Sequence, residues 1–236
     1  MRKLLYVPII HTEADLGSAA PAIGRRSASL CGEKRWAQHK AVVSEFWQRV
    51  ADYLSHIEAA DLRIYQDGLL AGGELGRKIV EEGARRGSKN YDIILDLIKR
   101  GAEIRATEDV SFLKAEYEHI SRLTQAKSPA HGTPAHMEYE SHKERLTNER
   151  DRFVARTIDE TLSEGEVGIL FMGAYHDVIS HLAPDIVVEQ IKEQEKVKAY
   201  FEELIHRRDE EEFEQLAEYL ASPIVYPKNG DKISGS

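Results

Sequence analysis

Histidines and carboxylates recur in this sequence where predicted strands end. His11 follows the apolar run at 3–10, and Glu13 and Asp15 come within the next four residues. Histidine beside carboxylates suits either a divalent metal ion or acid–base chemistry. The small residues that follow, up to position 33, predict a long loop around a site, with a solvated polar loop as the alternative.

Two further predicted strands end in acidic residues. Asp67 comes after the strand at 61–65, and Glu108 and Asp109 come after the strand at 102–106. Because Asp67 precedes a glycine, an ordinary Asp-Gly turn explains it equally well. If the strands are parallel, their carboxyl ends meet at one edge of the sheet, and we expect these acids to converge there with the histidines.

A helix predicted at 141–162 brings charged side chains to the same region. Its apolar stripe includes Phe153 and Ile158, and Glu149 and Arg150 fall on or beside that stripe. Charges that face a core are costly unless they are paired. These two residues therefore indicate either a functional site or a structural ion pair.

The strand predicted after this helix leads directly to a histidine. The run at 167–172 is almost entirely apolar, as expected of a strand that is buried on both faces of a parallel sheet. Gly173 ends it, and His176 follows just beyond its carboxyl end, where open α/β sheets build their ligand sites. A capping or core histidine is the alternative interpretation.

Alternating strands and helices predict a three-layer α/β/α fold. We expect a mostly parallel sheet of about five or more strands, with helices on both faces and a helical C-terminal extension at 192–220 broken near Arg208. A single α/β domain is expected over 1–222, with a lid loop at 125–140 and a flexible tail at 223–236.

Net charge, apolar runs and cysteine content indicate which kinds of partner and which compartment to expect. The net charge of −9 argues against non-specific binding to nucleic acid, and no apolar run approaches the length needed to cross a bilayer. A single cysteine, Cys31, rules out an intrachain disulfide, and with no recognisable signal peptide the chain is expected in the cytoplasm. Aromatic positions on the C-terminal helices, expected to be exposed, favour a homodimer.

The segment at 148–177 resembles the TraB, Tiki, erythromycin-esterase and ChaN group of α/β proteins. Members carry two GxxH motifs at strand ends and a helix with a Glu-Arg-Asn signature before the second motif. Here Gly173 to His176 match the second motif in full, and Asn148-Glu-Arg-Asp151 is similar to the helix signature, with Asp151 where asparagine is usual.

Elsewhere the sequence departs from that pattern. His11 is kept without the glycine of the first motif, and Gln66-Asp67 replaces the glutamate expected after the second strand. The resemblance implies an α/β fold. Its members include metal-dependent proteases, hydrolases of small esters and a haem-binding protein, so it leaves the function open.

The leading hypothesis is a metal-dependent hydrolase that cleaves a peptide- or ester-type bond in a small-molecule or peptide substrate. His11, Glu13 and His176 are the expected ligands of a divalent metal ion, which would activate a bound water. Without metal, a histidine and a glutamate can still transfer protons.

The remaining polar residues have expected roles in the same site. Glu149 is expected to be the base or a supporting acid. Arg150 is the group expected to hold an anion or oxyanion, and Asp67 and Glu108 are additional catalytic acids. The main alternative is a binding protein that holds haem or another anionic ligand without turnover. A nucleotide-binding module is a third hypothesis, although the loop after the first strand lacks a recognised phosphate-binding pattern.

Overall fold

Five parallel strands form one sheet in the computed structural model, which describes residues 1–12, 14–15, 20–112, 114 and 134–225. They are β1 (Arg2–Ile9), β2 (Arg63–Gln66), β3 (Glu103–Arg105), β4 (Val167–Gly173) and β5 (Ile186–Gln190). Their order across the sheet is β3-β2-β4-β1-β5, so β4 lies at the centre with a parallel partner on each side. The carboxyl ends of all five strands therefore lie at one edge.

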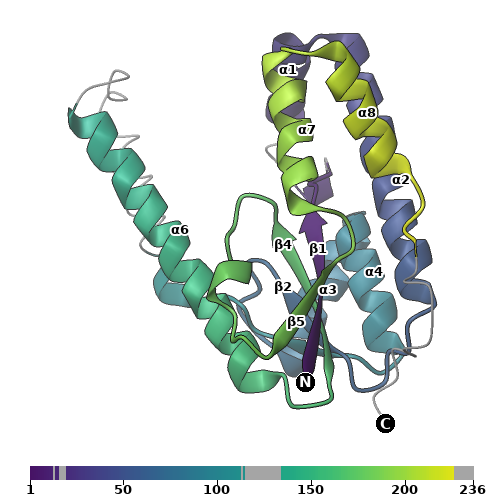
Figure 1. Cartoon of the computed structure of the whole chain (residues 1–236), viewed down its shortest axis with the longest axis vertical. Coiled ribbons are helices and arrows are strands. Elements are labelled where there is room, and N and C mark those ends of the chain that lie inside the picture. The colour runs from purple at the N-terminus through teal and green to yellow at the C-terminus, as the bar shows by residue number, and fades with distance from the viewer. Residues whose placement is uncertain (13, 16–19, 113, 115–133, 226–236) are drawn as a thin grey trace.

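Helices cover both faces of this sheet, as the sequence predicted (Figure 1). The helices are α1 (Ala20–Cys31), α2 (Glu33–Ser55), α3 (Gly73–Arg85), α4 (Lys89–Lys99), α6 (Pro134–Thr161), α7 (Gln194–His206) and α8 (Glu210–Ala221), with a short 3-10 turn, η2 (Ile179–His181). α6 runs along one side of the sheet, while α1, α7 and one end of α2 rise beyond the carboxyl ends of the strands. The predicted three-layer α/β/α class is confirmed.

Strand alternation builds a separate core on each face. Successive residues of a strand point to opposite sides, so Leu4 and Leu170 pack toward α6 while Leu5 and Phe171 join the core on the other face. The core beneath α6 includes Ile158, which is fully buried. Because β4 is buried on both faces, its sequence is an unbroken apolar run apart from Gly168 and the terminal Gly173.

The C-terminal helices pack against α2 rather than presenting their aromatic residues to solvent. Tyr200 and Phe213 are fully buried and stack at 5.3 Å between ring centroids. The guanidinium of Arg35 lies 3.8 Å from the centre of the Phe213 ring and also forms an ion pair with Glu210. The expectation that these aromatics are exposed is wrong, because they are core residues of this chain.

Two predicted boundaries differ from the structure. Residues 20–31, expected to be part of a site loop, form α1. This stretch is rich in alanine, the strongest helix former, and its proline falls in the first turn, where proline is tolerated. Gly32 then adopts a φ of 85°, which allows the sharp turn between α1 and α2.

The helix expected from 141 begins earlier, at Pro134. Proline suits the first position of a helix because the amide hydrogen it lacks would have no partner inside the helix. The expected lid loop at 125–140 is therefore helical from 134 onward, and its first nine residues lie outside the described part of the chain. Most of the predicted helix at 110–124 and of the tail at 223–236 also lies outside it.

Within the described ranges, no helix is both long enough and apolar enough to cross a membrane.

Replacing Phe213 with alanine tests whether α8 belongs to the same folding unit as the sheet. We expect Phe213→Ala to lower the free energy of unfolding by about 3 to 5 kcal/mol, because it leaves a cavity in the core. Urea unfolding followed by both circular dichroism and tryptophan fluorescence should show one shared transition. If α8 and α7 melted in a separate early step, the expectation of a single domain over 1–222 would be wrong.

Candidate active site

The loop after β4 brings backbone and side chains unusually close together. The amide of His176 donates a hydrogen bond to the carbonyl of Gly173 at 3.1 Å, which closes a tight turn. A Cβ atom on Gly173 would lie 3.3 Å from both Asp67 Oδ2 and His176 Cδ2, which is tighter than about nine in ten such contacts. Glycine is therefore the residue that lets these two side chains flank the end of the strand.

Asp151 of α6 fixes the orientation of the His176 ring. Its Oδ1 lies 2.5 Å from His176 Nδ1, and its Oδ2 accepts a hydrogen bond from the Asp177 amide at 2.8 Å. Asp151 is only 2% exposed, so both carboxylate oxygens are satisfied inside the protein. With Nδ1 occupied in this way, Nε2 is the ring nitrogen left for chemistry.

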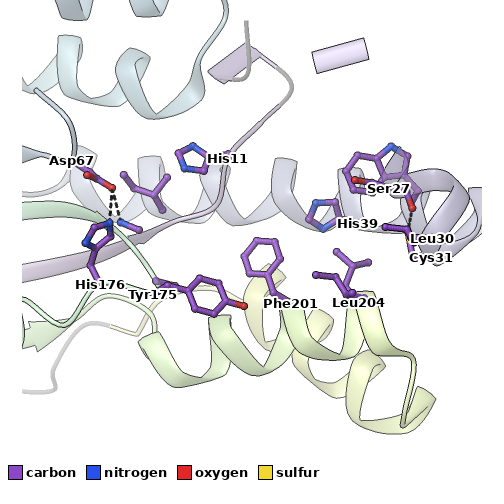
Figure 2. Close-up of a pocket in the computed structure, with 15 residues that line it drawn as sticks. His11, Ser27, Leu30, Cys31, His39, Asp67, Tyr175, His176, Phe201 and Leu204 are labelled. Atoms are coloured by element: carbon purple, nitrogen blue, oxygen red, sulfur yellow. Dashed lines mark hydrogen bonds and ion pairs between the residues drawn. The ribbon is translucent and has the colours of Figure 1, made fainter. Parts of the chain in front are cut away.

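Asp67 lies on the other side of the histidine ring, at the end of β2. Its amide donates to the carbonyl of Phe171 at 2.9 Å, and its Oδ2 accepts a hydrogen bond from the Gly173 amide at 3.3 Å. The same oxygen is 3.8 Å from His176 Nε2, an ion-pair contact when the histidine is protonated (Figure 2). His176 therefore lies between two carboxylates that come from different elements.

This setting changes the pKa of His176. Burial by itself favours the neutral ring, but the hydrogen bond with Asp151 and the negative charges of Asp67 and Asp151 outweigh it and raise the pKa above 6.5. Arg150 opposes them slightly. The two carboxylates therefore stabilise the protonated ring more than water does for a free histidine.

A second buried carboxylate pairs with Arg150. Glu108, which follows β3, has a side chain only 2% exposed, and its Oε2 is 2.5 Å from Arg150 Nη2. Burial raises the pKa of Glu108, and the nearby guanidinium opposes that rise. Since Arg150 Nη2 also lies 3.9 Å from Asp67 Oδ1, the arginine links the acids at the ends of β2 and β3.

A cavity of about 510 Å³ opens beside this group of residues (Figure 2). Asp67 and His176 line one part of it, and α1, α2 and α7 provide most of the remaining wall. His11 also lines this cavity, together with apolar side chains such as Phe201 and Leu204. A ligand in the cavity would therefore lie beside Asp67 and His176.

The structure brings together most, though not all, of the residues that the sequence singled out. Asp67, Glu108, Arg150 and His176 form one group of contacting side chains. Glu149 is exposed and lines a different hollow, with side chains of α6 and with His181. Asp109 is also exposed, and Glu13 lies outside the described residues.

The predicted metal ligands do not form a complete set in the described part of the chain. No group of three or more histidine, cysteine or acidic side chains there is arranged to hold a metal ion. His176 Nε2 and Asp67 Oδ2 provide two donors, and His11 lines the same cavity without a hydrogen bond or ion pair to either of these described residues. The prediction that Glu13 completes a site stays a prediction.

Two residues of the site escaped the sequence analysis. Asp151 was noted only as a departure from the Glu-Arg-Asn signature, although that position is the one that reaches His176. Gln194, at the start of α7, donates from Nε2 to the carbonyls of Ala174 and His176 at 2.8 and 2.6 Å and so holds the loop after β4. Nothing in the local sequence marked Gln194, because its partners lie about 20 residues earlier.

No family model, curated protein or solved structure matched this chain in the comparisons with known proteins. The similarity of segment 148–177 to the TraB and ChaN group therefore stays a prediction from sequence.

Changing Asp151 to asparagine tests how the pKa of His176 is set. We expect Asp151→Asn to lower that pKa. Burial favours the neutral ring, and in the variant Asp67 is the one carboxylate of the two that remains to oppose it. The imidazole signals of His176, followed by NMR against pH, report the shift directly. An unchanged titration would mean that Asp151 does not control the ring.

The contact between Asp151 and His176 also makes the stability of the protein depend on pH in a predictable direction. A raised histidine pKa adds stability at pH values below the unfolded value of about 6.5, and this contribution is lost as the pH rises through the folded-state value. We therefore expect the difference in the free energy of unfolding between the native protein and Asp151→Asn to shrink as the pH rises. Urea unfolding at a series of pH values measures it.

Removing Arg150 tests the pair with Glu108. We expect Arg150→Leu to lower the free energy of unfolding by about 3 to 5 kcal/mol at neutral pH, since it leaves a buried carboxylate without its cation. The double variant Arg150→Leu with Glu108→Leu should recover part of this loss. Equal losses in the single and double variants would show that the charge on Glu108 is not the cause.

Proposed function

We propose that this protein is a hydrolase of peptide- or ester-type bonds in which His176 transfers the proton. The observation that supports this most is the geometry of its ring: Nδ1 is held by the buried Asp151, and Nε2 faces Asp67 beside an open cavity. From the sequence, Glu149 was expected to act as the base or as a supporting acid of the site. In the structure Asp151, two positions further along the helix, lies against His176.

The proposed reaction uses water as the nucleophile. Nε2 of neutral His176 takes a proton from the water as its oxygen bonds to the substrate carbonyl carbon, which forms a tetrahedral intermediate. His176 then gives that proton to the leaving oxygen or nitrogen as its bond to carbon breaks, so the ring returns to its neutral form. Asp151 stabilises the imidazolium between these steps, as the carboxylate does in other histidine-based hydrolases.

Asp67 and Arg150 have supporting roles in this proposal. The carboxylate of Asp67 adds negative charge close to Nε2 and favours the protonated ring. Arg150 holds both Asp67 and Glu108, so it positions the acids around the histidine. Because two carboxylates already share its charge, it is a weaker anion-binding group than the sequence suggested.

Dependence on a divalent metal ion is a separate part of the proposal. The described residues supply two donors rather than the three protein ligands usual in catalytic zinc sites. We therefore assign no step of the reaction to a metal ion. Elemental analysis of protein purified without a metal-affinity column, and activity before and after chelation, test whether a metal is required.

The second candidate is a binding protein for haem or another anionic ligand. The cavity of about 510 Å³ favours it, because His11 and His39 line it as candidate axial ligands among apolar side chains. An absorbance scan decides this point, since bound haem gives a Soret band.

We also propose that the protein is cytoplasmic. A homodimer stays a prediction, because Tyr200 and Phe213 are buried within this chain and no longer argue for it. The one cysteine, Cys31, is a buried free thiol, which agrees with a reducing compartment. Light scattering coupled to size-exclusion chromatography measures the oligomeric state.

Replacing His176 tests the hydrolase proposal. We expect His176→Gln to lower kcat by about 100- to 10,000-fold on any ester or peptide that the native protein cleaves, because general acid–base catalysis contributes on that scale. A panel of chromogenic esters and peptides, assayed with and without divalent metals, provides the substrates. Circular dichroism should show that the variant remains folded.

Two matched variants make this test specific. His56→Gln changes an exposed histidine at the end of α2 and should leave kcat unchanged. Comparing Asp151→Asn with Glu149→Gln identifies the carboxylate partner: we expect a large loss of activity only in the first. If His176→Gln and His56→Gln were equally active, His176 would not be the catalytic base.

A further inference from the structure

The cavity beside His176 extends into an apolar chamber between helices. Leu30 and Cys31 of α1, Trp36 of α2, and Phe201 and Leu204 of α7 line it. Leu30 is 60% exposed, and Tyr175 on the loop after β4 is also 60% exposed, so these apolar side chains are in contact with solvent. A ligand that covers such surfaces is favoured in proportion to the apolar area it removes from water.

The chamber carries little charge away from the His176 end. Among the described residues that line it, none is lysine or arginine, and Asp67 is the single carboxylate. His39 is neutral at physiological pH, because burial lowers its pKa to about 4. A carboxylate or phosphate placed between these walls would lose its hydration without gaining a cation, so the chamber favours an uncharged group.

His39 is a polar group that lies among the apolar walls of the chamber. It is only 5% exposed, lies in a stack with Trp36 at 4.9 Å between ring centroids, and its Nδ1 is 3.0 Å from the hydroxyl of Tyr200. Within the described residues, Nε2 of His39 has no hydrogen-bond partner. According to its tautomer, Nε2 can donate to a carbonyl or accept from a hydroxyl of the ligand.

From these walls we propose the class of substrate: an uncharged ester or amide whose bulky apolar acyl or aryl group fills the chamber, with one hydroxyl or carbonyl that bonds to His39 Nε2. This inference rests on the proposed hydrolase function, because the scissile bond is placed at His176. The placement follows from continuity, since Asp67 and His176 line the same cavity as Phe201 and Leu204.

Direct binding tests the chamber independently of catalysis. The neutral dye N-phenyl-1-naphthylamine, which fluoresces in apolar surroundings, is titrated into the full-length protein. Leu30→Glu and Ile205→Glu place a charge on the wall at positions exposed enough to spare the fold, and each should weaken binding at least tenfold. Val187→Glu changes a residue of β5 that is 46% exposed and does not line the cavity, so its affinity should be unchanged.

Competition with two further ligands tests the hydrogen bond to His39. In dye displacement, 1-naphthol should bind with about five times the affinity of naphthalene, because it gains one hydrogen bond. In His39→Phe this advantage of the hydroxyl should disappear while the affinity for naphthalene is kept. If the hydroxyl gave the same advantage in the variant, His39 would not be the recognition group.

A series of p-nitrophenyl esters connects the chamber to turnover. From acetate to octanoate, kcat/KM should rise by up to about fourfold for each methylene that is buried. In Leu30→Glu, kcat/KM should depend less on the length of the acyl chain. Dye binding without hydrolysis of any ester would leave the chamber as a binding site and overturn the proposed hydrolase function. Hydrolysis without dye binding or chain-length dependence would keep the hydrolase and overturn the substrate class.

Discussion

A carboxylate that is removed from water must find hydrogen-bond donors inside the protein, and Asp151 meets this requirement by joining α6 to the loop after β4. Its two carboxylate oxygens form hydrogen bonds with the His176 ring and the Asp177 amide. One buried residue therefore fixes the helix over the sheet edge, the course of the loop and the direction of Nε2. The glycine at 173 is the matching constraint, because a side chain there would crowd Asp67 and His176.

Helical geometry gives the neighbouring residues Glu149, Arg150 and Asp151 of α6 different roles. Successive residues turn by about 100° around the axis, so Arg150 and Asp151 both reach the sheet edge while Glu149 points elsewhere. Arg150 balances the buried Glu108, and Asp151 orients His176. The result is a group of three carboxylates, one arginine and one histidine at the end of an apolar chamber, a setting suited to transferring a proton to a neutral substrate.

Periodicity in the sequence was sufficient to predict most of the fold. The apolar run of β4 and the 3.6-residue repeat of α2 each reflect burial that the local sequence must satisfy. The class of fold, and the expectation that a site lies at the carboxyl edge, followed from the alternation of these elements. Helix α1 was missed because its small residues carry no strong apolar stripe, although its alanines and the position of its proline are compatible with a helix.

The sequence by itself determined that His176, Asp67 and Glu108 lie at strand ends and that charges of α6 approach them. Only the tertiary structure decided which charges meet. Asp151 rather than Glu149 contacts His176, and Gln194 holds the loop from a distant helix. The physical reason is that a strand end fixes a position along the chain, whereas the partner of a buried charge depends on the rotation and packing of another element, which local sequence does not encode.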